Sequence, residues 1–109
     1  CMLTKEELPE CPVATTVQLI GNKWKLLIIR NLLKAPQRFT ELKNGVPSIS
    51  KKVLSENLRA MEEDGIISRT VYAEVPPRVE YALTDIGRSL LQLMDDMAAW
   101  GERYKAMIG

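Results

Sequence analysis

The sequence predicts an α+β domain that is mostly α-helical, in which one β-hairpin interrupts a series of helices. Apolar residues recur at helical spacing over most of the chain, and they alternate with polar residues only between residues 67 and 83. The 109 residues are enough for one domain with a small core, so we expect a single domain over residues 1–109.

Two helices are predicted in the first third of the chain. The spacing of Val13, Val17 and Ile20 is helical, and Gly21 follows as a stop signal. The stretch KWKLLIIRNLLK (residues 23–34) is apolar on nearly all sides, which is typical of a central helix with several neighbours. A proline soon after this stretch ends the helix.

A short helix, a tight turn and a second helix follow. The stretch RFTELKNG predicts a helix that Gly45 closes with a positive φ. Pro47 disfavours helix at the preceding residue, and Ser50 is placed to cap the next helix. That second helix should end at Asp64–Gly65 in a Schellman cap. Its expected buried residues share one face: Val53, Leu54, Leu58 and Met61.

Two alternating segments, residues 67–72 and 79–83, then flank a loop that contains two adjacent prolines. They predict a β-hairpin with the prolines at its tip. Thr84 caps a final helix of about 20 residues, which would be roughly 30 Å long and longer than this core needs. We therefore expect an N-terminal arm (1–12), a body (13–83) and a long C-terminal helix (84–109).

The order of short helix, turn, second helix and hairpin is that of a winged helix-turn-helix, whose second helix enters the major groove of DNA. The charge distribution agrees, because residues 23–59 hold nine basic and two acidic residues in a chain of net charge +1. Most of the expected DNA contacts lie on the second helix or cap it: Ser50, Lys51, Lys52, Ser55, Glu56 and Arg59. Two further contacts are expected from Arg38 at the start of the short helix and from Arg78 at the hairpin tip.

Two alternatives remain open for these residues. The lysines could simply solvate a helix, although lysine at a helix start opposes the helix dipole. Arg78 could pair at the surface with Glu74 or Glu80 instead of reaching DNA. The acids Glu62, Glu63 and Asp64 lie at the far end of the second helix, away from the groove.

The chain resembles the HxlR-type winged helix-turn-helix transcriptional regulators of bacteria and archaea. The matching stretches are residues 11–33, 38–67, 71–90 and 98–101, so the resemblance spans residues 11–101, about five-sixths of the chain. They include the Cys-Pro opening, the GNKW element, the ISKKVL run and the PPRVEYALT hairpin in that order. Val53 before Leu54 is a conservative departure from the family pattern.

The resemblance implies a homodimer formed by the first and last helices, and a double-stranded operator with inverted-repeat symmetry. The last helix carries more apolar residues than one core-facing side needs, which agrees with a homodimer. The alternative is that all of these residues belong to the core of a single chain. The expected interface residues are Val13, Val17, Leu90, Met94, Met97, Trp100 and Tyr104.

The resemblance also implies a candidate redox site, because some family members sense electrophiles or oxidants through the cysteine before the first helix. Cys11 occupies that position. Backbone N–H groups at a helix start favour a thiolate, whereas nearby Glu7 and Glu10 oppose it. The alternative is a small structural residue. With two cysteines and no histidine, we expect no metal site and no cofactor.

An enzyme is a poor alternative, because the chain has no Gly-rich phosphate loop and no nucleophile–base pair. Acidic pairs such as Asp95–Asp96 lie on predicted solvated helix faces. A winged helix that binds RNA or another protein is the stronger rival to a DNA-binding regulator. We expect no membrane partner, no secretory signal and a cytoplasmic location, since neither a spanning segment nor a signal pattern is present.

Overall fold

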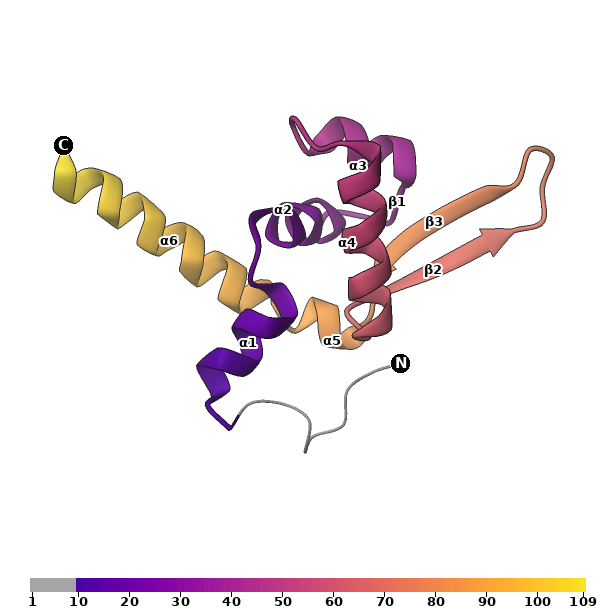
Figure 1. The fold of residues 1–109 in the computed structure, drawn as a ribbon. Coiled ribbons are helices and arrows are strands. Elements are labelled where there is room, and N and C mark those ends of the chain that lie inside the picture. Colours follow the sequence, from indigo (N-terminus) through magenta and orange to yellow (C-terminus); the bar gives the residue numbers. More distant parts are fainter. Residues whose placement is uncertain (1–9) are drawn as a thin grey trace.

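The computed structural model describes residues 10–109 (Figure 1). The first nine residues, which include Cys1, Glu7 and most of the predicted arm, lie outside the described part. The fold class is confirmed, with helices packed around a small sheet. The elements in chain order are α1 (Pro12–Ile20), α2 (Lys23–Leu32), β1 (Gln37–Arg38), α3 (Phe39–Gly45), α4 (Lys51–Glu63), β2 (Ile67–Tyr72), β3 (Arg78–Leu83), α5 (Asp85–Arg88) and α6 (Leu91–Ile108).

The core lies where α2, α3 and α4 meet the base of the hairpin. Ile28 and Ile29 of α2 are fully buried, which agrees with the prediction of a central helix. The α4 residues predicted to face inward do so, although Val53 is only partly buried. The other buried core residues are Ile20, Leu32, Leu42, Val46, Ile49, Leu54, Leu58, Met61, Ile66, Ile67 and Leu83.

The hairpin is the predicted one, with β2 and β3 antiparallel from the Ile67–Leu83 pair to the Tyr72–Arg78 pair. A third strand, β1, pairs antiparallel with the other edge of β3, so the strand order is β1-β3-β2. The sequence did not predict β1, because a strand of two residues is too short to show alternation.

The expectation that Gly45 has a positive φ is wrong. The described residues with positive φ are Ser48 in the turn, Gly65 after α4, and the terminal Gly109. Gly45 instead leaves room for the Asn31 side chain, whose Oδ1 would lie 2.8 Å from an added Cβ. The Asn31 amide donates to the Gly45 carbonyl at 3.3 Å, which ties α3 to α2.

The predicted single final helix is also wrong in one respect, because it is divided into α5 and α6. Thr84 caps α5 as expected, with its hydroxyl accepting from the Gly87 N–H at 3.1 Å. The turn then tightens, since the N–H groups of Ser89 and Leu90 donate to carbonyls three residues back. The Ser89 hydroxyl also donates to the Ile86 carbonyl, a local bond that bends helices. The hairpin and α6 extend from opposite sides of the core (Figure 1).

Candidate nucleic-acid interface

Local sequence fixes both ends of α4. At its start, the Ser50 hydroxyl accepts from the Val53 N–H at 3.1 Å, as the sequence predicts. At its end, the Ile66 N–H donates to the Met61 carbonyl at 2.9 Å and Gly65 has a φ of 78°. This is the expected Schellman cap. The two caps therefore set where α4 begins and ends.

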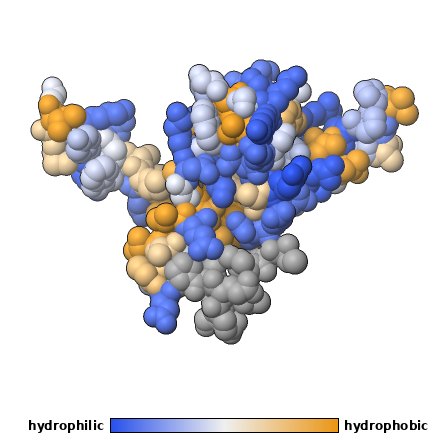
Figure 2. Space-filling view, viewed as in Figure 1, coloured by the Kyte–Doolittle hydropathy of each residue, from blue (hydrophilic) through white to orange (hydrophobic). Residues whose placement is uncertain are grey.

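The outward face of α4 is open. Lys51, Lys52, Ser55 and Glu56 are exposed, and so is Arg59 one turn further along. Basic and hydroxyl groups therefore stand at the N-terminal half of the helix, where the groove-entering part of a recognition helix lies. The predicted set on α4 is brought together on one surface, which the space-filling view shows as mostly hydrophilic (Figure 2).

Side-chain hydrogen bonds link α4 to the start of α2. The Asn22 side chain caps α2 by accepting from the Lys25 N–H at 2.8 Å. The same side chain donates to Oδ1 of Asn57 at 3.1 Å, and Asn57 in turn donates to the Val53 carbonyl at 2.8 Å. The start of α2 is thus tied to the middle of α4, which limits rotation of α4 about its axis.

Arg38 and Arg78 belong to other elements than α4. Arg38 lies on β1 opposite Glu80, and its backbone N–H donates to Glu41 at 2.8 Å. Arg78 forms salt bridges with Glu74 at 3.2 Å and Glu80 at 3.1 Å, and its guanidinium stacks 3.9 Å above the Tyr72 ring. Surface pairing, the alternative left open above, is the arrangement that the structure shows for Arg78.

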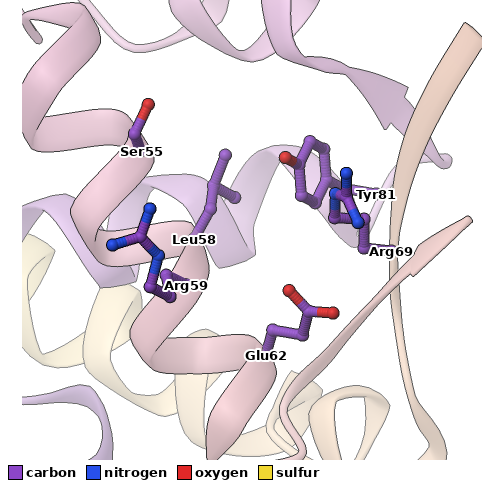
Figure 3. A pocket seen from close by; sticks show the side chains of 6 residues that line it. All are labelled: Ser55, Leu58, Arg59, Glu62, Arg69 and Tyr81. Atoms are coloured by element: carbon purple, nitrogen blue, oxygen red, sulfur yellow. The ribbon is translucent and has the colours of Figure 1, made fainter. Parts of the chain in front are cut away.

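A polar cavity of about 310 Å³ lies between α4 and the hairpin (Figure 3). Its two strand residues, Arg69 and Tyr81, were not predicted from the sequence; they are cross-strand partners in the β2–β3 register. Arg69 could have been noticed, because it is a charged residue between two apolar ones on the same strand face. The cavity is lined by Ser55, Leu58, Arg59, Glu62, Arg69 and Tyr81.

The predicted interface residues fall into two groups. Leu90 and Met94 pack partly against the chain's own core. By contrast, Val13 is 71% exposed, Val17 58% and Trp100 56%. Met97 and Tyr104 are also exposed, and the Trp100 and Tyr104 rings stack with centroids 5.5 Å apart. Figure 2 shows hydrophobic patches over α1 and over the end of α6.

Cys11 is exposed and is the N-cap residue of α1, directly before Pro12 in the first turn. Its carbonyl accepts from the Thr15 N–H at 3.0 Å, so the residue is fixed to the helix.

Among residues 10–109, there is no group of three or more His, Cys, Asp or Glu side chains that could hold a metal ion. In the same range, no helix is both long and apolar enough to cross a bilayer.

These features define a winged helix-turn-helix of the DNA-binding type. The chain belongs to the family described as HxlR-like helix-turn-helix, which it matches over residues 19–108. It is therefore a member of a family of transcriptional regulators, as the resemblance in the sequence implied.

Three relatives illustrate the family. The HTH-type transcriptional regulator YdeP of Bacillus subtilis is 42% identical over 105 residues, which cover 96% of this chain and 82% of YdeP. A structure titled the redox regulator HypR in its oxidized form aligns with a TM-score of 0.80 and 43% identity, covering 85% of this chain and 96% of HypR. Reduced YodB from B. subtilis aligns with a TM-score of 0.77 and 36% identity, covering 88% of this chain and 95% of YodB.

Proposed function

We propose that this protein is a sequence-specific transcriptional regulator that binds an inverted-repeat DNA operator as a homodimer through α4. The observation that carries the proposal is the open face of α4, where Lys51, Lys52 and Ser55 are exposed beside a capped helix start. Backbone N–H groups at that start add to the attraction for phosphate. The acids Glu62 and Glu63 stand at the other end of the helix.

The exposed apolar surface supports a homodimer. Contiguous apolar patches are uncommon on monomers. Here the exposed Val13 and Val17 lie one turn apart on α1, and the exposed Trp100 stacks on Tyr104 of α6. A groove between α1, α2 and α6 adjoins them and is mostly apolar. A twofold dimer through this surface would present two copies of α4 to one face of DNA, about 34 Å apart. The operator would then carry the same twofold symmetry.

A mobility-shift assay tests DNA binding against the rival of an RNA- or protein-binding winged helix. The chain is titrated with a duplex from upstream of its own coding region, with a random duplex and with a structured RNA. The proposal predicts preference for the upstream duplex and a steep loss of affinity with rising salt. Equal affinity for all three nucleic acids would contradict it.

We further propose that Cys11 makes DNA binding sensitive to oxidants. HypR, one of the similar structures, is a redox regulator. The structure of diamide-treated YodB also aligns with this chain, with 37% identity and a TM-score of 0.73. In this chain Cys11 is exposed and lies two residues before Val13 of the proposed interface. A modification there would change how two copies pack and hence the spacing of their α4 helices.

Diamide should release the protein from DNA, and Cys11→Ser should abolish this response. Diamide takes two electrons and two protons from two thiols as they form a disulfide, so Cys11 would join a partner's cysteine or an added small thiol. The mobility shift is repeated with diamide and then with excess dithiothreitol, which should restore binding. Cys1→Ser is the matched control and should still respond. Release of the Cys11→Ser protein by diamide would contradict the assignment.

A further inference from the structure

The polar cavity between α4 and the hairpin is built from both elements. Ser55, Arg59 and Glu62 are spaced four and three residues apart, so they line one face of α4. The opposite wall is formed by Arg69 and Tyr81, which the strand register places side by side. Figure 3 shows Glu62 pointing into the space between the helix and the strands, with Arg69 and Tyr81 across from it.

Charge and hydrogen-bonding capacity identify the kind of ligand that fits. The lining offers two guanidinium groups and two hydroxyl groups as donors to an anion, and one carboxylate that opposes it. Figure 3 shows the Arg59 guanidinium directed away from Arg69 and Tyr81, so this side chain must turn toward the strands to share one anion with Arg69. The salt bridges of residues 10–109 involve Arg78, Arg88 and Lys105, not the cavity arginines. The lining therefore carries a net charge of about +1 that no ion pair in the described part offsets. A phosphodiester carries one negative charge, whereas a phosphomonoester carries about −1.5 to −2.

We propose that this cavity binds one phosphodiester group of the DNA strand that runs beside the α4-bound groove. The proposal rests on the proposed function, and it adds Arg69 and Tyr81 to the DNA-binding surface. Ser55 and Arg59 belong both to the outward face of α4 and to the cavity lining. A DNA strand bound along that face would therefore pass the mouth of the cavity. Arginine forks are well suited to phosphate oxygens.

Glu62 has a defined part in this arrangement. It keeps the net charge of the lining at one, which matches a diester and disfavours a doubly charged free phosphate. A contact to phosphate also carries no base information, so the cavity fixes the position of α4 and adds affinity for any sequence.

Two substitutions with opposite expected effects on DNA affinity test the cavity in a mobility-shift assay. Arg69→Gln should weaken binding to operator and to random duplexes by the same factor, at least about tenfold, because a dimer loses two arginines. The slope of log affinity against log salt should fall by about two. Glu62→Gln should instead tighten binding to both duplexes by roughly two- to tenfold.

Matched controls separate the cavity from the general field of the protein. Lys34→Gln removes an exposed positive charge after α2, and Glu63→Gln removes the carboxylate next to Glu62 but outside the cavity lining. Each should change affinity less than its cavity counterpart. Unchanged binding by Arg69→Gln, a loss confined to the operator, or equal effects of Glu62→Gln and Glu63→Gln would each overturn the assignment.

Titration with inorganic phosphate distinguishes a DNA phosphodiester from a free phosphate ligand. At equal ionic strength, phosphate should raise the melting temperature of the free protein no more than chloride does. A phosphate-specific rise in the wild type that Arg69→Gln abolishes would overturn the diester assignment. If wild-type protein binds no duplex at all, the proposed function fails; if it binds and both cavity variants match it, only the cavity assignment fails.

Discussion

The double substitution Lys51→Gln, Lys52→Gln should lower operator affinity about 1000-fold without lowering the melting temperature. Both side chains are exposed at the start of α4, so their removal costs no packing. A dimer loses four phosphate contacts, which at roughly 1 kcal/mol each is about 4 kcal/mol, or a factor of about 1000. The slope of log affinity against log salt should fall by about 3 to 4.

The control is Arg30→Gln with Lys34→Gln, which removes the same charge from exposed positions outside α4. This pair should change affinity far less, because it alters only the long-range field. An equal loss from both double variants would show that net charge, not the position of the lysines on α4, governs binding. A lower melting temperature of the Lys51/Lys52 variant would also count against the assignment.

The substitution Leu54→Ala should destabilise the domain by about 2 to 5 kcal/mol, the cost of a cavity in a close-packed core. Leu54 is 0% exposed and lies in the buried core, on the inward face of α4. For a domain of this size, such a loss lowers the melting temperature by roughly 10 to 20 °C. Urea unfolding followed by circular dichroism measures the change directly.

Ser55→Ala is the matched control, since Ser55 is the next residue and faces solvent. It should change stability by less than about 0.5 kcal/mol. At temperatures where both variants are folded, Leu54→Ala should retain most of its DNA affinity, because the outward face is intact. Equal destabilisation by the two substitutions would contradict the assigned orientation of α4.

Local chemistry explains which parts of the fold could be predicted from the sequence. The limits of α4 depend on Ser50 at one end and Gly65 at the other, and both act through neighbouring backbone groups. The hairpin follows from alternation over residues 67–83. The outward set on α4 follows from the same helical spacing that predicts its buried set.

Two of the errors, at Gly45 and β1, arose where contacts between distant residues decide the structure. The third, at Ser89, arose where two local hydrogen-bond patterns compete. The role of Gly45 depends on Asn31, fourteen residues earlier, and no local pattern contains that contact. The strand β1 exists because the edge of β3 is available to pair with it. The break at Ser89 depends on a hydroxyl bond that competes with the regular helix, a choice that propensity does not resolve.

In the candidate site, too, some residues could be predicted from local sequence and others depend on contacts that only the folded chain makes. The α4 residues were predictable because they share one helix, but Arg78 depends on Glu74, Glu80 and the Tyr72 ring, whose positions only the folded hairpin sets. The polar cavity likewise requires the register that pairs Arg69 with Tyr81 and the packing that brings α4 beside them.

The most direct test of the central claim is a hydroxyl-radical footprint on duplexes that the protein selects from a random pool. Two α4 helices of one symmetric dimer should enrich an inverted repeat. They should protect two half-sites about 10 base pairs apart, equally on both strands. A pool that yields no enriched sequence, or a single protected site without twofold symmetry, would contradict the account.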